Sequence, residues 1–330
     1  MKSPKPAVEI TATGRYLPER ILTNADLERM VDTSDEWIRE RTGIRERRIG
    51  SCELSCAEMG TAASRIAMDR AGVTAGEIDL IVVSTATPDR LLPATACDIQ
   101  ARLGATHAAA MDISAACSGF IFALTVAEGY LTAGRGEIAL VVSTEKMTSI
   151  VDWDDRKTCV LFGDGAGAVV VKRSTNGRGV LSSFMRSDGT LAELLWRPAG
   201  GVIRPLDQER LAAKEHTVKM AGREVYKAAV RSMAEAADHA LARAGLTSDD
   251  VDLLIPHQAN MRIIESTARY ANIPMDKVFV NVDRYGNMSS ATVPVALDEA
   301  VESGRLKPGQ ICLMVAFGAG FTWASSVVRW

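Results

Sequence analysis

Three residues of this chain have side chains suited to thiol-based acyl chemistry: Cys117, His257 and Asn287. Cys117 lies in the stretch DISAACSGF, residues 112–120, where an apolar run passes into small residues and a buried helix is predicted to begin. A helix N-terminus stabilises a thiolate through its dipole, and its free N–H groups can hold an oxyanion. His257 and Asn287 follow 140 and 170 residues later, so the fold has to bring the three together.

Each of these residues also has a plainer interpretation. A cysteine in an apolar stretch is usually an inert core residue, but Cys117 is followed by Ser118 and Gly119, which leave room for close approach. A histidine after a proline can be structural, yet the other three histidines lie in loop or amphipathic-helix contexts. His257 is therefore the best-placed imidazole. Asn287 alone would be an ordinary turn residue.

Composition sets the broad class of the protein. The 330 residues are 47% hydrophobic and 24% charged, which is typical of a soluble globular protein of one or two domains. A net charge of −3 gives no reason to expect nucleic-acid binding. Cys52 and Cys56 have a helical spacing, but no second Cys/His pair accompanies them, so we expect no metal site.

The same features favour a cytoplasmic location. Six cysteines in a chain this long do not form a disulfide framework. Residues 1–6, MKSPKP, are not followed by an apolar stretch, which predicts no signal peptide, and no apolar run is long enough to span a membrane.

The chain contains an internal repeat. Residues 62–81 align without a gap on residues 235–254, and eight of the twenty positions are identical. Each copy predicts an alanine-rich helix that ends at Gly72 or Gly245, followed by a polar turn and an apolar strand. At an offset of 170, Cys117 falls opposite Asn287, and each begins a small-residue segment that leads into a helix.

The repeat predicts an α/β protein of two related halves. Residues 1–175 would carry Cys117, and residues 176–330 would carry His257 and Asn287. Alternating strands and helices favour mostly parallel sheets covered by helices. A pseudo-twofold between the halves places equivalent strand ends near each other, and ligands of α/β sheets usually bind there. The duplication thus gives a geometric reason for the three residues to meet.

Two glycine-rich segments are predicted to be turns. Residues 163–168, GDGAGA, lack the Lys-Ser/Thr of a phosphate-binding loop, and a strand follows them, so we expect a turn between buried strands. Residues 317–323, FGAGFTW, are similarly typical of a tight turn between strands, where backbone N–H groups can face a substrate oxygen.

Together these segments resemble the β-ketoacyl-[acyl-carrier-protein] synthase III family, the initiating condensing enzymes of fatty acid synthesis in the thiolase superfamily. The resemblance spans nearly the whole chain. The segments that carry it follow the family's order: residues 31–38, 41–47, 115–119, 162–167, 256–260, 286–287 and 321–323. It implies a thiolase-like fold, in which the two halves form α-β-α-β-α layers, and a homodimer.

The resemblance implies a role for each candidate residue. Cys117 matches the nucleophile that takes an acyl group from acyl-CoA. His257 and Asn287 match the pair that supports decarboxylation of malonyl-acyl-carrier protein and steadies the enolate oxygen. The backbone N–H groups of Cys117 and Ala319 match the oxyanion hole.

Binding residues and substrates follow from the same resemblance. Trp37 and Arg156 match residues that sandwich the CoA adenine, and Arg262 matches a basic residue that docks the acidic carrier protein. Acyl-CoA and malonyl-carrier protein would be substrates, with no metal or other cofactor. The C-terminal glycine-rich loop lacks the second cysteine of a biosynthetic thiolase, and hydroxymethylglutaryl-CoA synthase differs because it requires a glutamate.

Two positions depart from the family pattern. Ala319 stands where many members have glycine, so its N–H serves only if the backbone there suits alanine. Leu92 occupies a position often held by an aromatic residue that reaches into the partner subunit's acyl pocket. A smaller aliphatic side chain there favours longer or branched primers.

Alternative functions share the same nucleophile. A condensing enzyme or acyltransferase of secondary metabolism, of the polyketide-starter or quinolone type, also needs an acyl-cysteine. A non-enzymatic acyl- or CoA-binding protein would not need the intact trio of Cys117, His257 and Asn287.

Overall fold

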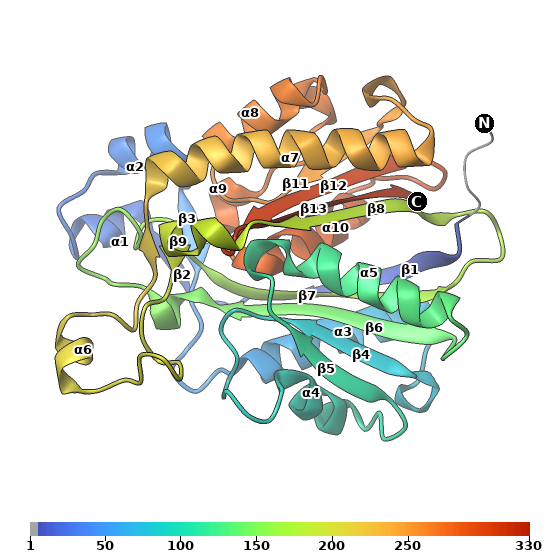
Figure 1. Ribbon diagram of the computed structural model, residues 1–330, viewed down its shortest axis with the longest axis horizontal. Coiled ribbons are helices and arrows are strands. Elements are labelled where there is room, and N and C mark those ends of the chain that lie inside the picture. The colour runs from blue at the N-terminus through green and yellow to red at the C-terminus, as the bar shows by residue number, and fades with distance from the viewer. Residues whose placement is uncertain (1–5) are drawn as a thin grey trace.

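Two β-sheets lie at the centre of the computed structural model, which describes residues 6–330 (Figure 1). The predicted absence of a signal peptide concerns mainly residues that lie outside this range. The first sheet has the order β1-β7-β6-β4-β5 and the second β11-β12-β13-β8. Their bounds are β1 Val8–Tyr16, β4 Leu80–Ser84, β5 Ala109–Ile113, β6 Ile138–Lys146, β7 Asp164–Arg173, β8 Gly179–Ser187, β11 Leu253–Pro256, β12 Ile311–Gly318 and β13 Thr322–Arg329.

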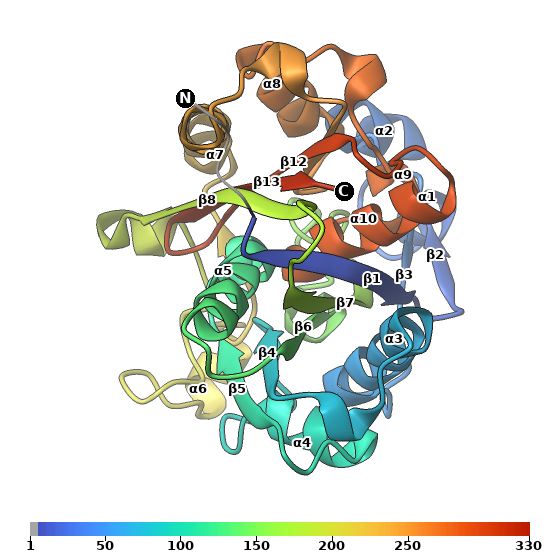
Figure 2. The same cartoon turned by 90° about the vertical axis from the view of Figure 1, so that its right-hand side faces the viewer.

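Helices separate and cover the two sheets, which gives the expected α-β-α-β-α layers (Figures 1 and 2). One outer layer packs on the first sheet, one on the second, and a middle layer lies between them. The outer helices are α3 (Cys56–Ala71) and α4 (Thr95–Leu103) on one side, and α7 (Gly222–Ala244) and α8 (Met261–Tyr270) on the other. The middle helices are α5 (Gly119–Thr132) and α10 (Thr292–Glu302).

Shorter elements connect or extend this framework. The strands are β2 (Ile21–Thr23), β3 (Glu46–Arg48), β9 (Leu195–Trp196) and β10 (Lys219–Met220), and the α-helices are α1 (Asn24–Glu28), α2 (Asp35–Thr42), α6 (Gln208–Ala212) and α9 (Val282–Tyr285). The 3-10 helices are η1 (Ala75–Glu77), η2 (Ala116–Ser118), η3 (Met147–Ile150), η4 (Gly189–Leu194), η5 (Ser248–Asp250), η6 (Met275–Lys277) and η7 (Ser289–Ala291).

The sequence repeat corresponds to a repeat of structure. In both copies a long helix, α3 or α7, ends at a left-handed glycine, Gly72 or Gly245, with φ of 62° and 69°. A 3-10 turn and a buried strand follow, β4 in one half and β11 in the other. The strand orders also correspond, except that the counterpart of β5 is reduced to one isolated bridge between Leu254 and Val278.

The expectation of mostly parallel sheets is wrong. In the first sheet β4 pairs in parallel with β5 and β6, whereas β7 is antiparallel to both β6 and β1. In the second sheet only β11 and β12 are parallel. The chain returns along β7 and β13 without a crossover helix, and such returning strands must run antiparallel.

The expected turn at residues 163–168 is also wrong, because β7 begins within this segment at Asp164. Its glycines serve close packing. A Cβ at Gly167 would lie 2.8 Å from Cβ of Pro294, and one at Gly165 would lie 2.7 Å from Sδ of Met288. Glycine therefore lets the segment that leads into α10 lie directly on β7. The other glycine-rich segment does form a turn, between β12 and β13.

Candidate active site

Cys117 occupies a sharp bend between a strand and a helix. The chain leaves β5 at Ile113, forms η2 and continues directly into α5, so the predicted helix start is confirmed. Ala116, just before the nucleophile, has a φ of 44°, which is unfavourable for a residue with a Cβ and marks a constrained site. Gly318 packs closely against Cys117: a Cβ added to Gly318 would lie 2.5 Å from the Cys117 nitrogen.

Ser289, which the sequence reasoning did not single out, links the catalytic candidates. The Cys117 thiol donates to Oγ of Ser289 across 3.6 Å. The backbone N–H of Ser289 donates to Oδ1 of Asn287 at 2.8 Å. Its carbonyl oxygen accepts from the Thr292 hydroxyl at 3.0 Å, and that hydroxyl lies 2.6 Å from Nδ1 of His257. The fold therefore brings Cys117, His257 and Asn287 into one hydrogen-bonded cluster, built from both halves.

The orientation of the Asn287 amide follows from these bonds. Because Oδ1 accepts from the Ser289 N–H, the two donors on Nδ2 are left for a ligand. The main chain of Asn287 is also fixed, since its N–H donates to Leu161 at 2.8 Å and its carbonyl accepts from Gly163 at 3.1 Å. Asn287 is thus a rigidly held hydrogen-bond donor.

His257 follows directly after β11. Its backbone N–H donates to the carbonyl of Val315 in β12 at 2.8 Å, and the side chain is buried. Nδ1 is bonded to Thr292, so Nε2 is the ring nitrogen left for a substrate. The carboxyl end of the strand therefore positions the imidazole.

Burial keeps both reactive side chains neutral in the unliganded site. It raises the pKa of the Cys117 thiol to about 12, and the hydrogen bond to Ser289 opposes this only in part. It lowers the pKa of His257 to about 3. Because each charged form loses its hydration, a thiol beside a neutral imidazole is the resting state.

Glu145, a carboxyl that the sequence reasoning overlooked, lies near the cluster. Burial raises its pKa, and its oxygens accept from the Ala86 N–H at 2.9 Å and from the hydroxyls of Thr87 and Ser290 at 2.9 and 2.7 Å. Its negative charge also raises the pKa of Cys117. Its role here is to tie β6 and the β4 loop to the Ser290 segment, rather than to contact the sulfur.

The backbone at Ala319 suits alanine. Four residues other than glycine have a positive φ among residues 6–330, and Ala319 is not one of them. It follows Gly318 at the end of β12, in the turn that packs against η2. The departure from glycine therefore leaves a backbone N–H at residue 319 in a turn that packs against η2.

Trp37 and Arg156 lie together, as the resemblance implies, but in a closed arrangement. The guanidinium carbon of Arg156 is 5.2 Å from the centre of the Trp37 ring, and Nη1 donates to the carbonyl of Asp32 at 2.8 Å. This distance is that of a direct cation–π contact, which leaves no room for a purine between the two. Arg156 must move aside before an adenine can be sandwiched there.

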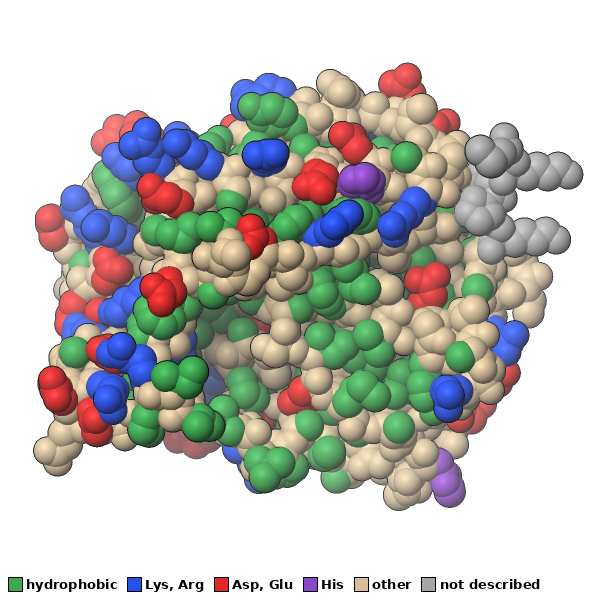
Figure 3. All heavy atoms as spheres, in the orientation of Figure 1, with side chains coloured by type: hydrophobic (Ala, Val, Ile, Leu, Met, Phe, Trp, Pro, Cys, Tyr) green, Lys and Arg blue, Asp and Glu red, His purple; other side chains and the backbone are tan. Residues whose placement is uncertain are grey.

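The two remaining candidates lie at the surface. Arg262 is exposed on α8, with its guanidinium carbon 5.9 Å from the Tyr226 ring centre. Basic side chains gather at the end of the molecule where α2 and the start of α7 lie (Figure 3). Leu92 is 86% exposed on the loop between β4 and α4, beside Leu91 at 83%. Neither Arg262 nor Leu92 contacts the cluster around Ser289.

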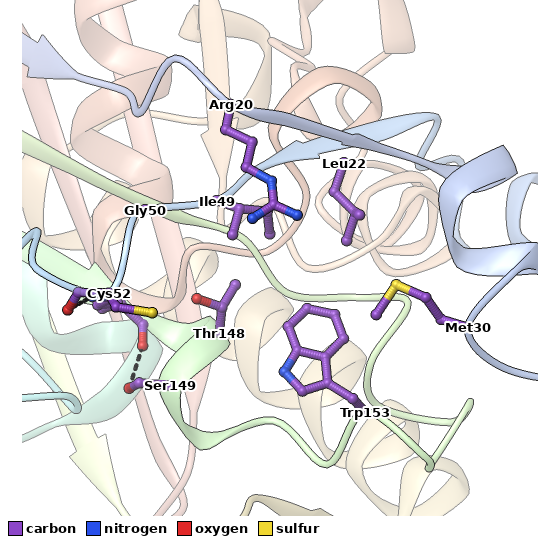
Figure 4. Close-up of a pocket in the computed structure, with 10 residues that line it drawn as sticks. Arg20, Leu22, Met30, Ile49, Gly50, Cys52, Thr148, Ser149 and Trp153 are labelled. Carbon is purple, nitrogen blue, oxygen red and sulfur yellow. Dashed lines mark hydrogen bonds between the residues drawn. The ribbon is translucent and has the colours of Figure 1, made fainter.

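A separate cavity of about 470 Å³ opens elsewhere on the surface (Figure 4). Trp153, Met30, Leu22 and Arg20 surround it, and the catalytic candidates are not among its lining residues. Within residues 6–330 no cluster of three or more His, Cys, Asp or Glu side chains could hold a metal ion. No helix in the described range has the length and apolar character needed to cross a membrane.

The layered fold, with a cysteine at the start of its middle helix and a histidine and asparagine from the other half, defines a thiolase-like condensing enzyme. The model of 3-oxoacyl-[acyl-carrier-protein] synthase III matches residues 111–189, and that of its C-terminal part matches residues 241–330. The chain belongs to the β-ketoacyl-[acyl-carrier-protein] synthase III family and is an acyltransferase of that type.

Individual relatives agree over the full length. The β-ketoacyl-[acyl-carrier-protein] synthase III of Caldanaerobacter subterraneus subsp. tengcongensis is 51% identical over 326 residues, 99% of this chain and 98% of the relative. The crystal structure of the 3-oxoacyl-[acyl-carrier-protein] synthase III from Aquifex aeolicus VF5 has a TM-score of 0.91 and 47% identity, covering 98% of this chain and 100% of that one. The priming β-ketosynthase of the R1128 polyketide pathway has the same TM-score at 37% identity, covering 99% and 97%.

Proposed function

We propose that Cys117 accepts an acyl group from acyl-CoA and that this acyl-enzyme condenses with malonyl-acyl-carrier protein. The products would be 3-oxoacyl-carrier protein and CO2, and the reaction would initiate fatty acid synthesis. The observation that carries the proposal is the chain of hydrogen bonds through Ser289, which joins a buried thiol to a fixed amide donor and an imidazole.

The first half-reaction makes a thioester on the enzyme. Sγ of Cys117 attacks the acyl-CoA carbonyl, the S–H bond and the C–S bond to CoA break, and the thiol proton ends on the CoA sulfur, which leaves as free CoA. The N–H groups of Cys117 and Ala319 would donate to the oxyanion that forms. A covalent intermediate divides one difficult condensation into two easier steps.

The second half-reaction needs no strong base. Breaking the bond to the malonyl carboxylate releases CO2 and leaves a carbanion, whose charge spreads to the thioester oxygen. Nδ2 of Asn287 donates to that oxygen, with His257 as the second donor. Because decarboxylation supplies the carbanion, the proposed reaction uses no metal and no cofactor besides its two substrates.

Substrate binding follows from the surface residues. Arg156 and Trp37 would hold the CoA adenine once Arg156 moves away from the ring. Exposed Arg262 would contact the acidic carrier protein, at the end of the molecule where other basic side chains gather.

A homodimer would complete the acyl site. Among residues 6–330 the strand β5 pairs on one side only, with β4, so its other edge is open to a second chain. Met111 in that strand is 39% exposed, and Leu91 and Leu92 extend from the neighbouring loop. An open edge with apolar side chains suits a second copy, so that Leu92 of one subunit reaches the other's acyl pocket.

A cytoplasmic location is consistent with these substrates. All six cysteines are free thiols, which fits a reducing compartment.

Priming of a polyketide pathway is the second candidate. It is favoured by the 37% identity to the R1128 priming ketosynthase. The fatty-acid and polyketide functions differ in the acyl group and the carrier protein rather than in Cys117, His257 and Asn287. Activity with fatty-acid and polyketide carrier proteins therefore separates the two functions.

Mass spectrometry tests the proposal directly. Incubation with acetyl-, isobutyryl- or octanoyl-CoA should add one acyl mass to the wild-type protein and none to Cys117→Ala. Cys312→Ala, which removes another buried thiol, should still be acylated. A wild-type protein that gains no acyl mass would overturn the proposed function, and strict preference for acetyl-CoA would contradict the role of Leu92.

A further inference from the structure

The hydroxyl of Thr292 has two partners but a single proton. Thr292 is fully buried at the start of α10. Its Oγ1 lies 2.6 Å from Nδ1 of His257 and 3.0 Å from the carbonyl oxygen of Ser289. The carbonyl can only accept, whereas Nδ1 either donates or accepts according to the tautomer of the ring.

The position of the Thr292 hydroxyl proton therefore decides whether Nε2 of His257 is a hydrogen-bond donor or an acceptor. When Thr292 donates to Ser289, Nδ1 must carry a proton to bond with Oγ1, and in a neutral ring Nε2 is then an acceptor. When the hydroxyl turns its proton toward Nδ1, that nitrogen is bare and Nε2 becomes a donor. Burial keeps the ring neutral, because it lowers the pKa of His257 to about 3.

Acylation needs Nε2 of His257 as a proton acceptor, whereas condensation needs it as a hydrogen-bond donor. In acylation, the thiol proton must move to an acceptor while the Sγ–C bond forms, and it returns to the CoA sulfur as the C–S bond to CoA breaks. In condensation, the electron pair released with CO2 needs a donor at the thioester oxygen. The new C–C bond then displaces Cys117 as a thiolate, which takes one proton from water.

We propose that Thr292 is a positioning residue that sets the tautomer of His257 in each half-reaction. In the free enzyme its hydroxyl donates to Ser289, which leaves Nε2 unprotonated and able to accept the Cys117 proton during acylation. In the acyl-enzyme it donates to Nδ1, and Nε2 donates to the substrate oxygen. The change of tautomer exchanges one proton at each ring nitrogen with water, so no net proton is consumed. The inference rests on the proposed function of the site.

Three variants of the full-length protein test this role. Thr292→Val removes the hydroxyl at nearly constant volume, and Thr292→Ser keeps it. Thr267→Val is the matched control, because Thr267 is an equally buried threonine whose hydroxyl donates to the sulfur of Met233 at 3.8 Å and lies outside the cluster around Ser289. Acylation is followed by mass spectrometry with acyl-CoA. Condensation is followed separately, from isolated acyl-enzyme and malonyl-carrier protein.

Thr292→Val should slow both half-reactions by at least about tenfold while KM for acyl-CoA stays within about twofold. Thr292→Ser and Thr267→Val should stay within about threefold of wild type. Unchanged rates in a folded Thr292→Val protein would contradict the inference alone, whereas a wild-type protein without acylation would contradict the proposed function.

Nitrogen-15 NMR of the histidine rings shows which nitrogen of His257 carries the proton, and it can be used even if Thr292→Val does not fold. The His257 signals are assigned by their loss in His257→Gln. Wild-type free enzyme should show a proton on Nδ1, and acyl-enzyme should show it on Nε2. The same tautomer in both states, or a protonated ring in the free enzyme at pH 7, would overturn the inference.

Discussion

At the scale of single residues, the resting site holds an uncharged pair. Burial makes a thiolate beside an imidazolium unfavourable, since it raises the pKa of Cys117 and lowers that of His257. Reactivity therefore appears only when a bound thioester provides a carbonyl for the sulfur and a destination for its proton. Such a site is protected from adventitious thiol chemistry between turnovers.

The depressed pKa of His257 predicts a specific loss of stability in acid. The unfolded chain binds a proton near pH 6.5, whereas the folded protein does so only near pH 3, so stability falls as pH decreases between these values. The contribution of His257 to the free energy of unfolding should be about 2 kcal/mol smaller at pH 5 than at pH 8. Urea unfolding of wild type and His257→Gln at both pH values measures it. Equal losses in the two proteins would contradict the shift.

Neighbouring positions in the C-terminal turn should respond in opposite ways. Ala319→Gly keeps the backbone N–H, so acylation should remain within about twofold of wild type. Gly318→Ala places a Cβ 2.5 Å from the Cys117 nitrogen, so the nucleophile must shift and acylation should fall at least about tenfold. Acyl-CoA turnover and a thermal melt of each variant separate the loss of activity from a loss of folding.

At the scale of elements, the middle helix layer depends on glycines in β7. Gly167→Ala should destabilise the fold by about 1–3 kcal/mol, because its Cβ would meet Pro294 at 2.8 Å and the Val295 nitrogen at 2.9 Å. Gly129→Ala is the control. It lies within α5 with nothing within 4 Å of its Cβ, and it should stabilise by about 0.5–1 kcal/mol. Denaturant titration compares the two; a neutral Gly167→Ala would contradict this account of packing.

The sequence predicted the elements that local chemistry specifies. The left-handed Gly72 ends α3 as expected, and a capping box of Ser55 and Glu58 begins this helix. Strand direction was not predictable in this way, because a buried strand has the same apolar composition whether its neighbour is parallel or antiparallel. The glycines of β7 were misread because their reason, the approach of Pro294 and Met288, comes from residues more than a hundred positions away.

The candidate site was predicted unevenly for a similar reason. Cys117, His257 and Asn287 stand out by residue type, and the fold brings them together. The pairing of Cys117 with Asn287 across the repeat is wrong, because η2 and η7 correspond residue by residue and set Cys117 opposite Ser290. Ser289 and Thr292 do not stand out, since hydroxyl residues are common near helix starts. Their roles depend on distances of 3.6 Å and 2.6 Å across the fold. The only available signal was the run of small polar residues after Asn287.

At the scale of the whole molecule, the open edge of β5 predicts that two copies associate. Met111→Arg should weaken the dimer, because it places charge on an edge strand that we expect to be buried. Met275→Arg is the control, since Met275 is equally exposed, at 39%, in the other half. Sedimentation of both variants should show a monomer only for Met111→Arg. A wild-type protein that sediments as a monomer would contradict the dimer itself.

The division at residues 175 and 176 stays a prediction. The chain leaves the first sheet at Arg173 and enters the second at Gly179, so the passage between the sheets lies in this region. The middle helices α5 and α10 nevertheless share one apolar core, which joins the two halves. Separate expression of each half is therefore expected to give unfolded protein.

The matching bends at η2 and η7 also have an evolutionary consequence. Each begins at a residue of positive φ, Ala116 at 44° and Ser289 at 47°, and leads into a middle helix, so the backbone conformation was kept while the side chains diverged to Cys117 in one bend and Ser290 in the other. An ancestor made of two identical copies would have carried the same residue at both places. Such a symmetric pair cannot combine a single nucleophile with the structural hydrogen bond that Ser290 donates to Glu145. Fusion into one chain allowed each copy to mutate alone, and asymmetric chemistry became possible on a symmetric scaffold.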